Sequence, residues 1–195
     1  MDDLSANTTV IRKIETIVEA ACARESNIFG YGIWTHHIVP VVQHGRCLAK
    51  LSEADAEIVE LAALLHDYAS IKDRALYENH HLHSAEEAAR LLADLGYPRE
   101  RIERVRHCIA VHRGSVRTET RSPEGECLAN ADALAHIQNV PSLLYLAFVQ
   151  FGMGIDEGTG WVKAKLERSW NKLSPQVQDT VKETYEACLK TLGVP

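Results

Sequence analysis

The chain has 195 residues, of which 46% are hydrophobic and 25% are charged, and its formal net charge is −6. This composition is ordinary for a globular protein, and the length suits one domain with a substantial core. The acidic balance, without a basic stripe, argues against recognition of a nucleic-acid backbone. A small anionic substrate stays compatible with the sequence if a metal ion or a Lys/Arg cluster overrides the net charge locally.

Targeting and redox signals are weak. The acidic start "MDDLSANTTV" lacks the features of a secretory signal, and no apolar run is long enough to cross a membrane. The five cysteines are scattered and form no C-x-x-C motif, which favours reduced thiols over a disulfide framework. We therefore expect a cytoplasmic protein without a membrane partner.

Helical spacing of apolar residues recurs along the chain, whereas alternating apolar runs are nearly absent. A first helix is predicted over about 9–24. A second starts at residue 34 or 35 and runs to 50, with Pro40 in its first turn or at a kink. A third extends to His66, and Ser52 is its predicted N-cap.

The later helices carry clearer start signals. Ser84 and Glu87 fit a capping box, which predicts a helix beginning after Ser84. Another helix is predicted over about 100–112. Ser122 is the expected N-cap of the next one, because Pro123 suits the first helical position.

Two or three more helices are expected from Pro141 onward, the last of them capped by Ser174. The sequence shows no internal repeat, low-complexity segment or linker. We predict an all-α fold in which residues 1–195 form a single-domain helical bundle.

An imidazole and a carboxylate stand side by side in the stretch "LAALLHDYASIKD". His66 and Asp67 end its apolar helix. Neighbouring residues within a helix point about 100° apart, so they do not normally share a site. At a helix end the backbone leaves helical geometry, and both side chains can then converge.

Other polar residues stand at the edges of separate predicted helices. His37 lies early in the second helix, His83 immediately precedes the predicted cap at Ser84, and His112 ends the fifth helix on its apolar face. Asp132 lies inside the sixth helix, where Asp is unfavourable. A buried carboxylate without a partner is costly, so Asp132 needs a counter-charge.

A metal ion is the simplest partner for this set. Imidazoles and carboxylates from different helices suit a borderline divalent cation, and the two oxygens of Asp67 could bridge two ions. A lone histidine on an apolar face is more often a core residue, and the joint pattern is what favours metal. We interpret the remaining histidines of this region as core or surface residues: His36, His44, His80, His81, His107 and His136.

Three stretches, "HIVPVVQHGRCLA", "AALLHDYASIK" and "ECLANADAL", resemble the signatures of the HD superfamily of metal-dependent phosphohydrolases. The resemblance covers about residues 35–140 and implies an HD-type helical core. By position, His37 is the first ligand, with His36 and His44 as rival assignments. His66 and Asp67 form the doublet, and Asp132 is the last ligand.

Some branches of the superfamily add two histidines and hold more than one metal. His83 in "HLHSAEEA" and His112 in "IAVHRG" resemble those additions. The resemblance thus implies one or two divalent ions, from among Mn, Fe, Ni, Co, Zn and Mg. We expect His83 and His112 to complete a second position, with Asp67 as the bridge.

The family often carries a lysine shortly after the doublet, commonly in "HDIGK". Here Lys72 lies farther along, in "HDYASIK". Together with His66 and Asp67 we predict Lys72 as a catalytic residue, and we predict Lys72 and Arg113 as binding residues for substrate phosphate.

The predicted function is hydrolysis of a phosphomonoester or phosphodiester in a nucleotide or another small phosphorylated metabolite. The sequence has no phosphate-binding Gly-x-x-x-x-Gly-Lys loop and no Gly-x-Ser-x-Gly elbow, so the metal must carry the chemistry. Two alternatives stay open: a di-iron oxygenase of the same fold, and a sensory module that holds metal without turnover.

Overall fold

The computed structural model describes residues 3–113 and 121–193. The described residues contain helices and no strand, which confirms the all-α prediction. The helices and helical turns are α1 (Asp3–Cys22), η1 (Trp34–Ile38), α2 (Val39–Lys50), α3 (Ala56–Leu65), α4 (Tyr68–Lys72), η2 (Arg74–Leu76), α5 (His80–Asp94), α6 (Arg99–Val111), α7 (Pro123–Gln138), α8 (Val140–Tyr145), η3 (Leu146–Gln150), α9 (Ile155–Lys172) and α10 (Pro175–Leu192).

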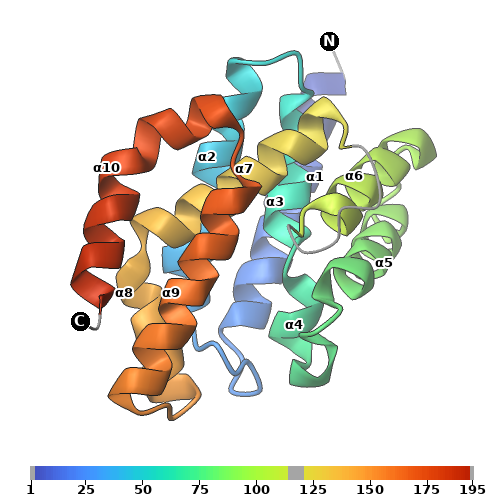
Figure 1. Ribbon diagram of the computed structural model, residues 1–195. Helices are drawn as coiled ribbons and strands as arrows, with labels where there is room; N and C mark the ends of the chain where they lie inside the picture. The colour runs from blue at the N-terminus through green and yellow to red at the C-terminus, as the bar shows by residue number, and fades with distance from the viewer. Residues whose placement is uncertain (1–2, 114–120, 194–195) are drawn as a thin grey trace.

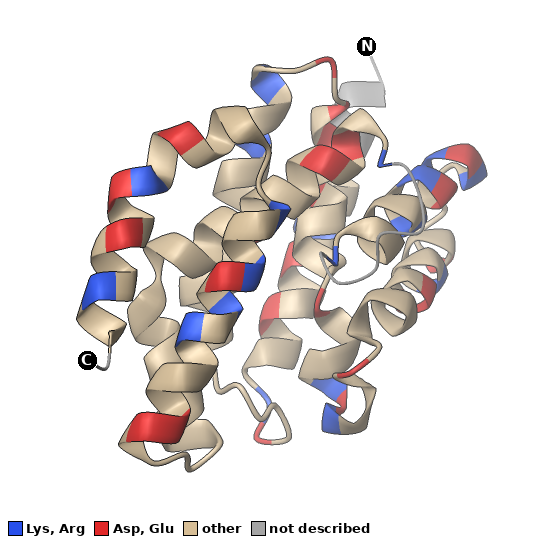
Figure 2. Cartoon of the chain, in the orientation of Figure 1, with Lys and Arg blue, Asp and Glu red and all other residues tan. Residues whose placement is uncertain are grey.

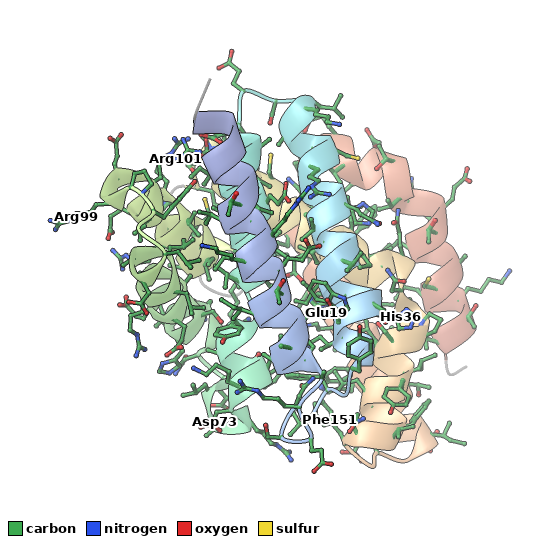
Figure 3. The ribbon with its side chains drawn as sticks, turned by 180° about the vertical axis from the view of Figure 1, so that it is seen from behind. Glu19, His36, Asp73, Arg99, Arg101 and Phe151 are labelled. Carbon is green, nitrogen blue, oxygen red and sulfur yellow. The ribbon has the colours of Figure 1, made fainter. Side chains whose placement is uncertain are left out.

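Helix α7 runs through the middle of the bundle and packs on α2, α3, α6, α9 and α10 (Figure 1). The pair α5 and α6 lies on one side of it, and α9 and α10 lie on the other. From behind, α1 lies across the bundle (Figure 3), where it packs on α3 and α4. Residues Cys127–Ile137 of α7 are all buried, as expected of a helix surrounded by others.

Helix α3 forms the other inner element. Leu61, Leu64 and Leu65 are almost completely buried, and each such side chain contributes about 1.5–3 kcal/mol to stability. Gly45 allows α2 to approach α3 closely, since a Cβ at this position would lie 2.9 Å from Val59 Cγ1. The close approach holds the first turns of α2 and the end of α3 in one region of the bundle.

Helix α1 begins at Asp3, before the predicted start near residue 9, and two predicted N-caps also differ from the structure. Helix α3 begins at Ala56, and its N-cap is Asp55, whose carboxylate accepts hydrogen bonds from the N–H groups of Glu57 and Ile58. The Ser52 hydroxyl instead contacts Ala49 O and Cys127 Sγ. Asp55, and not Ser52, is the N-cap because residues 51–55 are not helical and α3 starts at the next residue.

Helix α5 begins at His80, four residues before the predicted cap at Ser84. The Ser84 hydroxyl is buried inside the helix and accepts a hydrogen bond from the Ala69 N–H, at the start of α4. The carboxylate of Glu87 is bound by Lys72 and Arg90. The capping-box residues are therefore used for contacts between helices.

Other start signals are confirmed. Helix α7 begins at Pro123, and the Ser122 hydroxyl accepts a hydrogen bond from the Gly125 N–H. Helix α10 begins at Pro175, and Ser174 occupies the N-cap position, although its side chain makes no cap hydrogen bond. The loop expected before Ser122 includes residues 114–120, which lie outside the described residues. Within the described part of the chain, no helix combines the length and hydropathy needed to cross a bilayer.

Asp55→Ala should lower the free energy of unfolding by about 1–2 kcal/mol, because it removes the cap of a buried helix. Ser52→Ala is the matched control, and its effect should stay within about 0.5 kcal/mol. Urea denaturation at neutral pH measures both. An equal loss in the two variants would contradict the assignment of Asp55 as the cap.

The effect of Asp55 should also depend on pH. Burial raises the pKa of Asp55, but hydrogen bonds from Arg101 and the Ile58 N–H outweigh it, so the pKa lies below its usual value. A lowered folded-state pKa means that the stabilisation is present above the unfolded-state pKa and is lost as the pH falls through the folded-state pKa. The stability difference between the native protein and Asp55→Ala should therefore shrink in acid.

Candidate metal centre

The His66–Asp67 pair lies at the junction of two helices. Helix α3 ends at Leu65, and the backbone of Asp67 has left helical geometry (φ −108°, ψ 4°) before α4 begins at Tyr68. Both side chains consequently point into one site, where His66 Nε2 and Asp67 Oδ2 are 3.4 Å apart. The non-helical backbone at this junction thus allows two residues that are adjacent in sequence to face the same site.

His37 reaches the same site from a π-helical turn. In η1 the Val39 N–H bonds to Trp34 O, five residues back, so the turn is wider than in an α-helix. The next residue, Pro40, has no N–H for the carbonyl of His36. The wide turn leaves His36 exposed and His37 buried.

His37, His66 and Asp132 form a first group of possible ligands, whose ligand atoms all lie within 4.8 Å of one another. His37 Nε2 lies 3.2 Å from His66 Nε2 and 3.5 Å from Asp132 Oδ1. The rival positions do not contribute to this group, since His36 is exposed and half-buried His44 is absent from it.

Asp67, His80 and His112 form a second group of the same size. Asp67 Oδ1 lies 3.4 Å from His80 Nε2, while Asp67 Oδ2 lies 3.3 Å from His37 Nε2. One carboxylate oxygen therefore faces each group. This is the arrangement that a carboxylate bridging two ions requires.

The histidine rings are held in the tautomer that a metal ligand needs. The Nδ1 atoms of His66, His80 and His112 lie 2.8, 2.8 and 2.6 Å from the carbonyl oxygens three residues earlier. A carbonyl oxygen can only accept, so each Nδ1 carries a proton, and in the neutral form of each ring Nε2 then has a free lone pair. The donor set present in the described residues thus fits divalent cations.

The ionisation of the carboxylates and the histidines agrees with this arrangement. Burial raises the pKa values of Asp67 and Asp132, but His66 beside Asp67 and Lys172 beside Asp132 outweigh burial and hold both pKa values well below the usual range. Burial lowers the pKa values of His80 and His112, so both rings are neutral near pH 7. Burial also lowers the pKa of His66, but the charges of Asp67 and Asp132 outweigh it and raise that pKa. Charged carboxylates and neutral imidazoles are the forms that bind metal.

Asp132 also has a lysine neighbour, Lys172, that the sequence patterns did not indicate. The buried ammonium group of Lys172, at the end of α9, forms an ion pair with Asp132 Oδ2. Asp132 Oδ1 faces His37 and His66 instead. Lys172 therefore neutralises and orients the carboxylate while one oxygen stays turned to the first group.

The structure brings together five of the six predicted ligands: His37, His66, Asp67, His112 and Asp132. It does not bring His83 into either group, because His83 is exposed on α5. The position expected of His83 is taken by His80, which the sequence analysis had interpreted as a core or surface residue. The early start of α5 explains the difference, since it points His80 inward.

The two predicted phosphate-binding residues lie in different places. Lys72 is paired with Glu87 on the outer side of α4, at 2.7 Å, and lines neither cavity described below. Arg113 donates a hydrogen bond to Glu78 O and lines the cavity next to the second group. The structure thus places Arg113, and not Lys72, beside the candidate metal centre.

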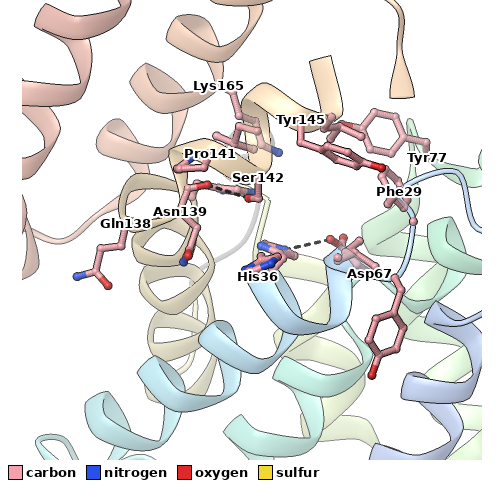
Figure 4. A pocket seen from close by; sticks show the side chains of 18 residues that line it. Phe29, His36, Asp67, Tyr77, Gln138, Asn139, Pro141, Ser142, Tyr145 and Lys165 are labelled. Carbon is pink, nitrogen blue, oxygen red and sulfur yellow. Dashed lines mark hydrogen bonds and ion pairs between the residues drawn. The ribbon is translucent and has the colours of Figure 1, made fainter. Parts of the chain in front are cut away.

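Two cavities meet at the candidate centre. The first, of about 630 Å³, is drawn in Figure 4: the rings of Phe29, Tyr77 and Tyr145 gather on one side, and Gln138 and Asn139 lie on the other. The second, of about 290 Å³, lies between α9 and the second group of ligands. Tyr77, His136 and Lys165 line both cavities.

His136 was also missed by the sequence analysis. Its ring stacks on that of His37, with centroids 4.8 Å apart, and its Nδ1 lies 3.2 Å from Ser169 Oγ. His136 follows Asp132 by four residues, so both lie on one face of α7. This spacing is the sequence feature from which a place for His136 near the site could have been predicted.

His80→Ala should lower the bound metal from about two ions per chain to about one, because it removes a ligand of the second group. His83→Ala is the matched control on the same helix and should leave the metal content unchanged. Elemental analysis of the purified variants gives the count. A loss of metal in His83→Ala, with normal content in His80→Ala, would restore the sequence-based assignment.

Comparison with solved structures finds the same fold in several bacterial proteins. YpgQ from Bacillus subtilis superposes with a TM-score of 0.68 at 21% identity, covering 95% of this chain and 93% of that one. YpgQ in complex with ADP gives the same score and identity, with 96% and 93% covered. The Lin1889 protein from Listeria innocua has a TM-score of 0.69 at 15% identity, with 95% and 93% covered.

A predicted HD superfamily hydrolase from an uncultured Thermotogales bacterium has a TM-score of 0.57 at 21% identity, with 93% of this chain and 88% of that one covered. No curated protein matches the sequence. The family model described as "HD domain" matches residues 34–137, a span that holds His37, His66, Asp67, His80, His112 and Asp132. The chain therefore belongs to the HD domain family, the family of metal-dependent phosphohydrolases that its motifs resemble.

Proposed function

We propose that this protein hydrolyses a phosphomonoester or phosphodiester bond in a nucleotide or another small phosphorylated metabolite, with one or two divalent ions as cofactors. The observation that carries the proposal is the position of Asp67. Its two oxygens face two groups of metal ligands, at the place where the two cavities meet. A phosphoryl group bound there would lie against both groups.

Divalent ions held by these residues supply Lewis acidity and an activated water at neutral pH. The protein supplies the geometry. The backbone carbonyls that bind Nδ1 of His66, His80 and His112 fix the ring orientations, and Lys172 fixes Asp132. Such preorganised groups need no rearrangement when charge develops in the transition state.

The first cavity supports a nucleotide as the substrate. Its volume lies in the range usual for small-molecule sites, and aromatic rings with amide groups suit a flat heterocycle with hydrogen-bonding edges. The similar fold of YpgQ, solved in complex with ADP, adds support from a distant relative. We therefore propose a small-molecule partner that enters through this cavity.

The di-iron oxygenase is the second candidate, favoured by a specific observation. Four histidines and two aspartates form the two ligand groups, and imidazole-rich sets also suit iron. The cationic lining of the second cavity favours phosphate chemistry instead. The third candidate is a sensory module that holds metal but catalyses no reaction, which distinguishes it from the phosphohydrolase and the oxygenase.

Activity should require metal. Chelator-treated protein, reloaded separately with Mn, Fe, Co, Ni, Zn or Mg, should release phosphate or nucleotide from members of a panel of nucleotides, phosphomonoesters and diesters. His66→Ala sets the background, because it removes a ligand. Oxygen consumption by the iron-loaded protein, without hydrolysis of any panel member, would establish the oxygenase instead. Absence of both reactions would favour the non-catalytic module.

Lys72→Ala should leave both metal content and turnover within about twofold of the native protein, because Lys72 pairs with Glu87 away from the site. Steady-state kinetics on the best panel substrate, with elemental analysis, tests this expectation. A selective fall in turnover would return Lys72 to the catalytic role that the sequence suggested.

A further inference from the structure

Helix α9 lines the second cavity with positive charge. Lys165, Arg168 and Lys172 lie three and four residues apart on one face of the helix, and all three line this cavity. Figure 2 shows successive blue bands along α9. The helix lies beyond residue 137, outside the span that matches the family model.

The three cations differ in their partners. Lys172 is buried and paired with Asp132, so its charge is already compensated. Lys165 and Arg168 form no ion pair with any carboxylate in residues 9–113 and 121–193, whose side chains the structure describes. Arg113, which follows α6, adds a third charge to the lining of the same cavity.

The cavity has little negative charge to balance this set. Asp132 is the one carboxylate among its described lining residues, and it is bound to Lys172. His80, His112 and His136 also line the cavity, and an imidazole brings no negative charge. An uncompensated cluster of cations in a partly enclosed cavity attracts anions strongly.

The position of the cavity limits which anion it receives. It adjoins the ligands His80 and His112 on one side, and Lys165 connects it to the larger, aromatic cavity on the other. A substrate with a single phosphate would place that group between the two ligand groups and would leave Arg168 and Arg113 without a phosphate to bind. A second phosphate, linked to the first, would extend toward them.

We propose that Lys165, Arg168 and Arg113 form an anion subsite for a second phosphate group, so that the preferred substrate carries at least two linked phosphates. This inference rests on the proposed function and specifies its substrate class. Lys165, at the junction of the two cavities, contacts the link between the two phosphates. Arg168 and Arg113 bind the outer one.

Inorganic pyrophosphate and inorganic phosphate are the probes for the subsite. Full-length protein is treated with chelator, so that binding does not depend on a metal ion, and circular dichroism verifies that it stays folded. Calorimetry should then show pyrophosphate binding at least about tenfold tighter than phosphate, since two groups meet the cationic wall. Equal affinities would overturn the proposal.

The double variant Lys165→Gln/Arg168→Gln should weaken pyrophosphate binding by about tenfold or more and change phosphate binding less. Lys163→Gln/Lys182→Gln is the matched control, because it removes two exposed charges from α9 and α10 that line neither cavity. An equal loss in the control would show a general charge effect and would reject the subsite.

A kinetic comparison separates the subsite from the proposed function. In the metal-loaded protein, the double variant should raise KM for substrates with two or three linked phosphates by about tenfold, with KM for monophosphates nearly unchanged. If monophosphates are hydrolysed as well as polyphosphates by both proteins, the subsite is wrong and the hydrolase stands. If no phosphate ester reacts while pyrophosphate still binds, the hydrolase is wrong and the anion subsite stands.

Discussion

Two carboxylates that are largely withdrawn from water impose the main constraint on this structure. Asp132 is buried in the central helix, and the side chain of Asp67 is only 19% exposed. Each would be strongly unfavourable without compensating charge or hydrogen bonds. Lys172 compensates one oxygen of Asp132, while the other oxygen and both oxygens of Asp67 face histidines.

Neutral imidazoles such as those of His80 and His112 cannot complete that compensation. Both rings donate Nδ1–H to backbone carbonyls, so each Nε2 carries a lone pair, and Nε2 of His80 faces Asp67 Oδ1. Lone pairs facing carboxylates repel unless a cation lies between them. Burial, tautomer and charge thus agree in favouring a cation within this cluster, whose residues could hold a metal ion.

Part of this site could be predicted from local sequence. Asp132 stood out because an Asp within an apolar helix needs a partner, and His66 with Asp67 stood out because adjacent polar residues ended an apolar helix. These signals survive in the structure since they depend only on which helix face is buried. The all-α fold followed from the same periodicity.

Helix starts were less predictable, because a capping residue can be taken by a tertiary contact. Ser84 has the right sequence context for an N-cap, but its hydroxyl binds the Ala69 N–H of another helix. The resulting shift of one turn moved the site position from His83 to His80. A local rule cannot detect this competition, since it depends on how α4 packs on α5.

Nearness in sequence also proved a poor guide to nearness in space. Lys72 follows the doublet by five residues yet lies outward, whereas Lys172 follows it by about a hundred and binds Asp132. The position of Lys172 depends on the packing of α9 on α7, in which buried Leu166 and Ser169 take part. No pattern within α9 itself reveals which helix it will contact.

The candidate metal ligands and the cavity walls are distributed differently along the chain. Residues 34–137 match the family model and hold all the candidate ligands with part of the walls, including Tyr77 and Arg113, whereas the other walls come from residues 29–33, from residues 138–146 and from α9. The ligands are constrained by coordination geometry, which tolerates little change. The cavity walls are constrained only by the shape and charge of the substrate, so substitutions there can alter substrate choice while the ligands of the metal centre stay in place.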